Sequence, residues 1–383
     1  MERAFIIAFC LILKSTLSLE SPHIWFGSAP FCGNQTSKCA ELGFQFVGED
    51  PYGDGHTCWT GRKTLCMLNE PKNTDKTPSD DKIIKLVHYN VDENPKGPIY
   101  YEKISGLSMS PELQNLSSKS YDGSIERICR IPEAFEKHLS SVDYISLFGM
   151  HSEGCEGSAN LVKLFDFYGW KYSSGYNGDK YFPNAGILTF SKHPMSVNSF
   201  EVFKSLTKNE PYPVKGYHIG CFKKNSEICV VTANLEESNC EICQRVKARQ
   251  LLEIKKSLAK LNRNASVIFQ ANLGINLLDV KADKFEKYIE SVGIEIDTEI
   301  ISHSPTTNDL VRDDEEQWNE YTGYIRRFRK PKRSKSYAVE LTADELFSYK
   351  AGRSLIESLM RWSEHGLTMN LAPNYPVITD IEL

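Results

Sequence analysis

The sequence predicts an alternating α/β domain preceded by a small disulfide-rich module. Strand-like and helix-like apolar patterns take turns from residue 82 to residue 383, and four cysteines crowd into residues 19–68, where aliphatic residues are few. A polar stretch without apolar periodicity, residues 69–81, is typical of a linker between the two parts. The length of 383 residues and the apolar fraction of 40% suffice for a sizeable core in the larger part.

Residues 1–18 have the pattern of a signal peptide. Arg3 precedes the short apolar run Ala4–Leu13, and small polar residues follow it. A run of about ten residues is too short to cross a bilayer as a helix but suits the apolar region of a signal. A buried N-terminal helix is the alternative. We therefore expect a secreted, extracellular protein, since no later stretch is apolar and long enough to span a membrane.

The cysteine pattern agrees with export. Once Cys10 leaves with the signal, ten cysteines remain, an even number that suits pairing in an oxidising compartment. The module contains Cys32, Cys39, Cys58 and Cys66, whose two expected bridges can connect in three ways. A zinc site is the alternative, but the module lacks a tight Cys-x-x-Cys spacing.

The remaining cysteines are expected to form disulfides in the larger domain. Cys221 and Cys229 flank a predicted hairpin turn and are placed to bridge its strands. Cys240 and Cys243 have the spacing of a redox or metal pair, but a disulfide with each other or with other cysteines fits an exported chain better. Cys129 and Cys155 are left as a residual pair. Three sequons also suit an exported chain and predict glycosylation at Asn34, Asn115 and Asn264.

The elements of the larger domain follow from their periodicity. The expected strands are Ile83–Tyr89, Tyr144–Phe148, Gly186–Ser191, Tyr217–Phe222, Ile228–Asn234, Ser266–Ala271 and the segment from Val377 to the end. The expected helices are Ser124–Leu139, Cys243–Leu261 and Thr342–Trp362. Pro132 must lie in a first turn or kink the first of these helices. Strands that alternate with helices predict a layered α/β fold.

Several strand-end motifs, taken in chain order, resemble the sphingomyelinase branch of the endonuclease/exonuclease/phosphatase superfamily. They are Ile84–Val91, Ile145–Met150, Asn184-Ala-Gly with Ser191-Lys-His-Pro194, Lys215-Gly216, Arg249-Gln250, Val267–Asn276 and Asn374–Val377. The resemblance covers residues 82–383. It implies a four-layered α/β/β/α sandwich, DNase I-like, with two sheets face to face and helices outside.

The same resemblance implies which positions carry the chemistry. The family binds Mg²⁺ with a Glu on the second strand and the Asn of the first, and it uses a strand-end His, a Gly-Asp-x-Asn turn and a late Asp-His pair. In this sequence the Asn is kept as Asn90, whereas the Glu position falls on Gly149. The other matching positions are Asn234, Asn272, Gly274 and Asn374.

These substitutions predict a degenerate active site with no intact catalytic residue and no metal. A carboxamide neither accepts nor returns a proton near neutral pH, and it offers Mg²⁺ no charge. We therefore expect a sphingomyelinase-like pseudoenzyme that needs no cofactor and acts by binding. The alternative is a divergent Mg²⁺-dependent phosphodiesterase of sphingomyelin or a related phosphodiester, in which His151 or Glu153 replaces the missing groups.

A basic cluster suggests one kind of partner. Its cations are Arg326, Arg327, Arg329, Lys330, Lys332, Arg333 and Lys335. It is either a solvated loop or a patch for anionic lipid head groups or an acidic glycan. A phospholipid membrane or an extracellular protein is therefore the expected partner, the latter also through the cysteine-rich module. The net charge of −5 disfavours nucleic acid, and nothing indicates an oligomeric state.

Overall fold

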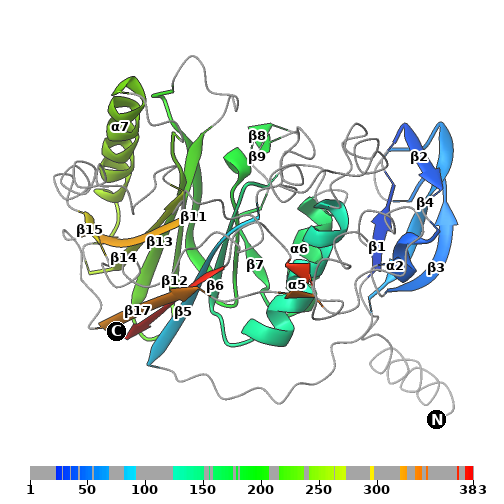
Figure 1. Cartoon of the computed structure of the whole chain (residues 1–383), viewed down its shortest axis with the longest axis horizontal. Helices are drawn as coiled ribbons and strands as arrows, with labels where there is room; N and C mark the ends of the chain where they lie inside the picture. The colour runs from blue at the N-terminus through cyan, green and yellow to red at the C-terminus, as the bar shows by residue number, and fades with distance from the viewer. Residues whose placement is uncertain are drawn as a thin grey trace, which may run out of the picture. The chain divides into compact units, whose positions relative to one another are not determined.

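The structure is a computed structural model. It describes residues 23–27, 29–34, 36–41, 44–53, 56–68, 82–91, 124–150, 155, 158–175, 178–179, 182–206, 215–236, 241–262, 264–272, 294–296, 320–325, 333–338, 342–343, 369–370 and 376–382. The chain divides into two compact units, Met1–Asn73 and Thr74–Leu383. Figure 1 shows the elements of both. Within the described residues, no helix is long and apolar enough to cross a membrane.

The small unit is a sheet built around one central strand. Its elements are β1 (His23–Phe26), β2 (Phe31–Asn34), α2 (Lys38–Glu41), β3 (Gln45–Asp50) and β4 (Thr60–Met67). Strand β4 pairs antiparallel with β1 and β3 and parallel with β2.

Two disulfides cross this small sheet. Of the three connectivities that the sequence leaves open, the structure has Cys32–Cys58 and Cys39–Cys66. All four cysteines are buried, as are Ile24, Phe26, Phe44 and Leu68, so the bridges supplement a small apolar core.

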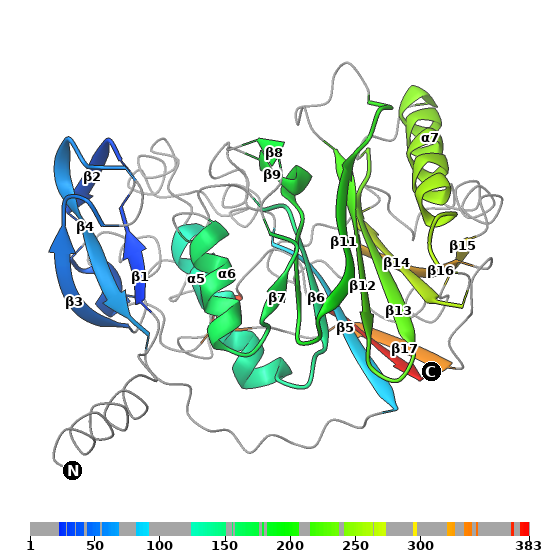
Figure 2. The ribbon, with the colours of Figure 1, turned by 180° about the vertical axis from the view of Figure 1, so that it is seen from behind.

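The large unit contains two six-stranded sheets that lie face to face between helices (Figures 1 and 2). The first sheet has the order β17-β20-β5-β6-β10-β7, and its strands are β17 (Arg333–Ala338), β20 (Val377–Glu382), β5 (Ile83–Asn90), β6 (Tyr144–Phe148), β10 (Leu188–Ser191) and β7 (Tyr172–Ser173). The second has the order β11-β12-β13-β14-β16-β15, and its strands are β11 (Met195–Val202), β12 (Gly216–Lys223), β13 (Glu227–Asn234), β14 (Ser266–Asn272), β16 (Glu320–Ile325) and β15 (Ile294–Ile296). The predicted four-layered sandwich is therefore confirmed.

Because successive side chains of a strand point to opposite faces, each sheet turns one face toward the other sheet and one face toward the helices. Between the sheets, Ile84, Leu86, Tyr144 and Ile381 of the first sheet pack with Phe222, Ile228, Val230 and Ile268 of the second. On the far side of the first sheet, Tyr89 contacts Phe135 of α5 (Ser124–Leu139), and Phe190 stacks on Phe165 of α6 (Ser158–Phe167). Helix α7 (Glu241–Leu258) packs on the second sheet through Leu251, Ile254 and Leu258.

Of the two places that the sequence allows for Pro132, the structure has the interior of α5, so the helix lacks one internal hydrogen bond there. The third predicted helix is corrected. Thr342 begins no helix, because Thr342–Ala343 is the short strand β18, paired with β19 (Met369–Asn370). Such pairing is long-range and leaves no trace in the local periodicity. The remainder of the predicted helix, 344–362, lies outside the described residues.

Two disulfides of the large unit match the sequence prediction. Cys221 and Cys229 face each other across the β12–β13 hairpin and are bonded, as are Cys129 and Cys155. Cys243 is disulfide-bonded too, with a partner outside the described residues. Cys240 also lies outside the described residues.

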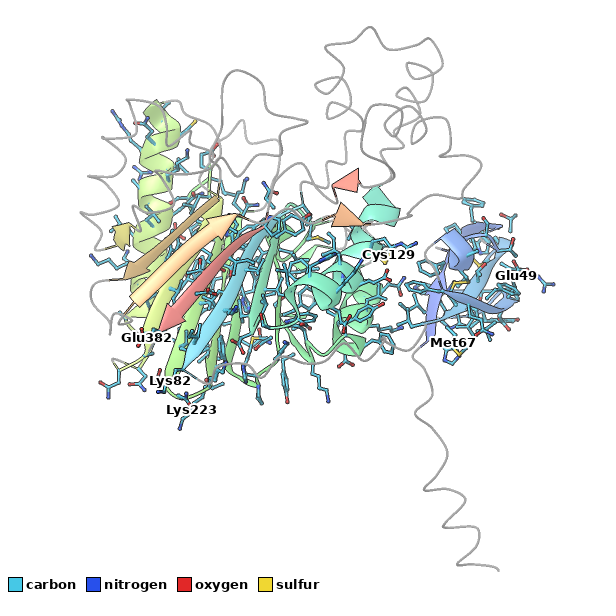
Figure 3. All side chains as sticks on the ribbon, turned by 60° about the horizontal axis from the view of Figure 1, so that its bottom comes forward. Glu49, Met67, Lys82, Cys129, Lys223 and Glu382 are labelled. Atoms are coloured by element: carbon cyan, nitrogen blue, oxygen red, sulfur yellow. A yellow bond between two sulfur atoms is a disulfide. The ribbon has the colours of Figure 1, made fainter. Side chains whose placement is uncertain are left out.

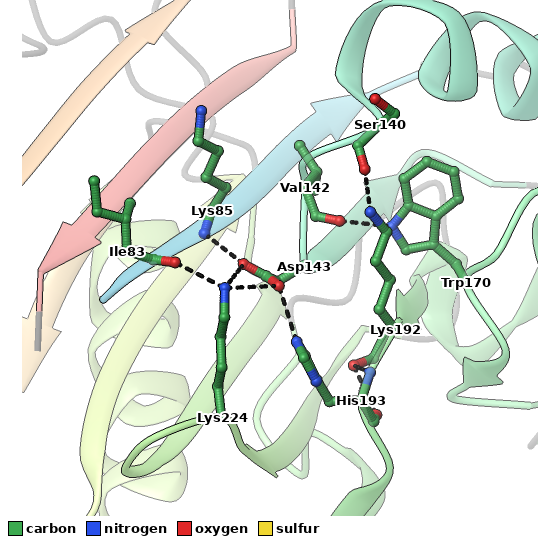
Figure 4. A network of polar contacts seen from close by, with 10 residues as sticks. Ile83, Lys85, Ser140, Val142, Asp143, Trp170, Lys192, His193 and Lys224 are labelled. Carbon is green, nitrogen blue, oxygen red and sulfur yellow. Dashed lines mark hydrogen bonds and ion pairs between the residues drawn. The ribbon is translucent and has the colours of Figure 1, made fainter. Parts of the chain in front are cut away.

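A polar cluster holds the two sheets together where β5, β6 and β13 begin. Asp143, which precedes β6, accepts hydrogen bonds from His193 Nε2 at 2.9 Å and from the backbone N–H of Lys85 at 3.0 Å. Lys224, from the β12–β13 turn, places its Nζ 3.3 Å from Asp143 Oδ2 and donates to the carbonyl of Ile83 (Figure 4). We call Asp143, His193 and Lys224 the Asp143 cluster. The labelled residues Lys82, Lys223 and Glu382 lie at this same end of the sandwich (Figure 3).

Candidate functional site

The opposite end of the sandwich gathers the strand ends that the sequence singles out. Strands β5 and β6 are parallel, with Asn90 beside Phe148, and β13 and β14 are parallel, with Asn234 beside Asn272. Because parallel strands end at the same edge, Asn90 closes its strand at this edge of the first sheet, and Asn234 and Asn272 close theirs at this edge of the second. We call this end the strand edge.

Asn234 makes two hydrogen bonds at the strand edge, one through each polar atom of its carboxamide. Its Nδ2 donates to the carbonyl of Ala185 at 3.0 Å, and its Oδ1 accepts from Lys215 Nζ at 3.2 Å. Lys215 has no exposed surface, and Asn234 has 5%. Ala185 stands just before β10 of the first sheet, so this amide connects the two sheets. The orientation of the amide follows from its partners, since an ammonium group can only donate.

Gly149 follows β6 directly and has a backbone φ of 66°. This left-handed conformation suits glycine and strains any residue with a Cβ. The neighbouring backbone is tied to the edge, because the N–H of Met150 donates to the carbonyl of Gly186 at 3.1 Å. A carboxylate at position 149 therefore has a backbone cost in this structure.

The strand edge does not fit a divalent metal as far as the structure describes it. Mg²⁺ prefers charged oxygen ligands, and Asn90, Gly149 and Asn234 supply none. Throughout the described residues, no group of three or more His, Cys, Asp or Glu side chains is placed to hold a metal ion. One carboxylate residue does stand at this edge, because the backbone register puts Glu320 of β16 beside Asn272, but among the described residues it belongs to no such group.

One residue layer below the strand edge, the inward faces of four strands remain polar. We call His88, Ser146, Thr232 and Gln270 the polar layer; each is fully buried. Ser146 Oγ donates to Gln270 Oε1 at 2.8 Å and lies 2.8 Å from Thr232 Oγ1. Since a serine hydroxyl has one hydrogen, Thr232 must donate to Ser146. His88 stacks on Phe148, with ring centroids 4.1 Å apart, and burial lowers its pKa to about 3.

A second buried histidine, His218, belongs to a separate and satisfied network. Its Nδ1 lies 3.2 Å from Thr189 Oγ1 and 3.3 Å from the hydroxyl of Tyr144, and its Nε2 lies 2.7 Å from Asn198 Oδ1. An amide oxygen only accepts, so Nε2 carries the proton. Burial lowers the pKa of His218 to about 3, so this ring is a neutral link within the core and does not face solvent.

The structure brings together some of the predicted site residues and leaves others untested. Asn90, Gly149, Asn234 and Asn272 lie at the strand edge. His151, Glu153, Gly274, Asn374 and Asn115 lie outside the described residues, as do Arg326, Arg327, Arg329, Lys330 and Lys332. Arg333 and Lys335 lie in strand β17, so these two cations of the basic cluster do not belong to a loop. Asn34 lies in β2, and Asn264 is exposed in a turn, so glycosylation stays a prediction.

Sequence reasoning missed the contact of Lys215 with Asn234 and the polar layer as a unit. A signal for the layer was present. In three strands a polar residue precedes the terminal Asn by two positions, as in His88-x-Asn90, Thr232-x-Asn234 and Gln270-x-Asn272. Because alternate residues of a strand share a face, each polar residue must lie directly beneath its Asn.

Comparison with known proteins shows which known fold this architecture has. No protein-family model matches the sequence, and no curated protein matches it in sequence. Solved structures do match. SmcL has 11% identity and a TM-score of 0.55, with 78% of this chain and 99% of that chain covered.

Two further structures agree. A variant of the beta toxin of Staphylococcus aureus with bound magnesium ions has 14% identity and a TM-score of 0.54, covering 77% of this chain and 98% of its own. Sphingomyelinase C of Streptomyces griseocarneus has 14% identity and a TM-score of 0.52, covering 78% and 99%. Identities this low establish the fold, which is the DNase I-like sandwich in the form found in sphingomyelinases.

Proposed function

We propose that the chain is a secreted protein with a sphingomyelinase fold that does not hydrolyse phosphodiesters and acts by binding. Its ligand is a lipid head group, a membrane surface or an extracellular protein. The observation that carries the proposal is the state of Asn234. At the position where the resemblance implies a titrating histidine, the structure has an amide whose two polar atoms already bind Ala185 and Lys215.

The chemistry of phosphodiester hydrolysis explains why this matters. The reaction needs a cation on the phosphoryl oxygens and a group that removes a proton from water. An amide at Asn234 cannot take that proton, and Gly149 offers no ligand. The absence of one acid–base group alone slows such reactions by roughly 10²–10⁴-fold. We therefore expect no measurable turnover at the strand edge.

Secretion is supported by the disulfides. The two bridges of the small unit and the Cys129–Cys155 and Cys221–Cys229 bridges suit an oxidising compartment. They are compatible with an extracellular protein, whether or not the strand edge is catalytic.

Hydrolysis of sphingomyelin tests the proposal directly. Purified mature protein is incubated with sphingomyelin vesicles and Mg²⁺, beside sphingomyelinase C as the active control, and released phosphocholine is measured. We expect no release above the vesicle blank. Mg²⁺-dependent release would refute the proposal and would make His151 and Glu153 the first residues to replace.

Binding is measured in the same preparation. Sedimentation with vesicles of phosphatidylcholine alone, or with added phosphatidylserine, separates zwitterionic from anionic recognition. If the basic cluster binds the surface, each of its cations contributes about 1 kcal/mol on anionic vesicles. Substitution of Arg326, Arg327 and Arg329 by Gln should then weaken sedimentation on anionic vesicles only. Equal loss on both vesicle types would argue against an electrostatic contact.

A further inference from the structure

The polar layer contains three nitrogen atoms that the protein leaves without hydrogen-bond partners. Among the described residues, His88 Nδ1, His88 Nε2 and Gln270 Nε2 are buried and have no partner. Buried polar groups in native proteins are almost always satisfied, and an unmade hydrogen bond costs about 1–3 kcal/mol. Three such atoms in one layer need an explanation.

The three atoms lie in one region of the interior. His88 is the direct neighbour of Ser146 in the β5–β6 register, and Ser146 donates to the oxygen of the Gln270 amide. The inward faces of β5 and β14 are apolar one layer below, where Leu86 and Ile268 belong to the same core cluster. The unpaired nitrogens therefore lie between this apolar floor and the asparagines of the strand edge.

We infer that the polar layer is a water-binding site, in which ordered water molecules bridge the His88 ring and the amide of Gln270. The valences of the groups fit. The Gln270 amide can donate a hydrogen to a water oxygen, and that water can donate to an unprotonated ring nitrogen. A neutral imidazole has one N–H and one acceptor nitrogen, so a second water can accept from the protonated ring nitrogen. Buried waters with two to four polar partners are common in proteins.

This site extends the strand edge inward by one layer. A group that reaches Asn90 and Asn234 meets hydrated, uncharged polar side chains beneath them, beside the Phe148 ring that stacks on His88. The inference holds whether or not the chain hydrolyses a phosphodiester, because it concerns only the unpaired nitrogens of His88 and Gln270.

A crystal structure of the unsubstituted protein that resolves internal solvent is the first test. We expect an ordered water within roughly 2.7–3.2 Å of Gln270 Nε2 and a ring nitrogen of His88. A layer empty of solvent, in a map that shows other buried waters, would overturn the inference.

The sign of a stability change is the second test. His88→Leu has similar volume and removes both ring nitrogens. If water satisfies them, the folding equilibrium constant should fall about tenfold, as for a lost buried hydrogen bond. If the two ring nitrogens have no partner at all, the folding equilibrium constant should rise, and that result would overturn the inference. His218→Leu is the matched control, because this equally buried ring has protein partners and its loss must destabilise.

Discussion

The Asp143 cluster provides a sharp test of how the two sheets are held together. Asp143→Asn keeps the shape of the side chain and one carbonyl oxygen but removes the charge. Asp143 lies between His193 Nε2 at 2.9 Å and Lys224 Nζ at 3.3 Å, and its side chain is only 5% exposed (Figure 4). The substitution therefore leaves Lys224, itself 8% exposed, beside a neutral group.

The expected loss follows from these contacts. A hydrogen bond to a charged group contributes about 1.5–3 kcal/mol, and removal of one partner of a buried ion pair costs about 3–5 kcal/mol. Lys224 keeps its bond to the carbonyl of Ile83, and the asparagine oxygen can still accept one hydrogen. We therefore expect Asp143→Asn to lower the free energy of unfolding by about 2–4 kcal/mol at pH 7.

The pH dependence has a definite sign. Burial alone would raise the pKa of Asp143, but the hydrogen bonds from His193 and the Lys85 N–H, with the charge of Lys224, hold it below its usual value. A carboxyl group with a lowered pKa in the folded state stabilises the fold at pH values above its unfolded pKa of about 3.9. This contribution is lost as the pH falls through the lower, folded value. The difference between the natural protein and Asp143→Asn should therefore shrink below about pH 4.

Urea unfolding followed by tryptophan fluorescence measures both effects. Trp170 is a local reporter, because its Nε1 donates to the carbonyl of Val142 at 3.1 Å beside the cluster (Figure 4). Asp166→Asn is the matched control, because Asp166 is exposed on α6. Equal stability of Asp143→Asn and the natural protein at pH 7, or a difference that grows on acidification, would refute the reasoning.

Three further predictions concern glycines and metal. Gly149→Glu should lower the free energy of unfolding by about 1–2 kcal/mol, because the backbone φ of 66° strains any residue with a Cβ. The same variant should show no Mg²⁺-dependent sphingomyelin hydrolysis, and measured turnover would contradict this. Gly216→Ala should cost about 1–3 kcal/mol in urea unfolding, because its Cβ would lie 2.6 Å from the backbone oxygen of Glu201. The control Gly48→Ala meets nothing within 4 Å, and an equal loss there would refute the steric argument. Finally, Mg²⁺ and EDTA should give the same melting temperature, whereas a rise with Mg²⁺ would reveal a metal site.

The sequence predicts elements well where the local pattern is strong. Helix Ser124–Leu139 and strand Tyr144–Phe148 have the predicted bounds, because apolar spacing defines both. Strand Met195–Val202 was missed. It is the edge strand of its sheet, its burial alternates weakly, and a register shift between Met195 and Val197 breaks the period of two. Helix Ser158–Phe167 was also missed, although it packs Phe165 against the first sheet.

The sequence predicts which residues lie at the strand edge but not their hydrogen-bond partners. The motifs name Asn90, Gly149 and Asn234 as edge positions, since each ends or follows a recognisable strand. They say nothing of the partners, because Lys215 and Ala185 reach Asn234 from other strands. The left-handed backbone at Gly149 is likewise a property of the folded chain that no residue spacing reveals.

The use of asparagine at this edge has a physical rationale of its own. Carboxylates that lie close together without a cation repel one another, and this repulsion raises the pKa of one of them. A carboxamide both donates and accepts, so it can be satisfied by neighbouring backbone and lysine groups without a metal ion. Asn234 shows this, because it links the carbonyl of Ala185 to the ammonium of Lys215. This arrangement agrees with the proposed loss of hydrolysis, because an amide at Asn234 lacks the charge and the proton acceptor that phosphodiester hydrolysis requires.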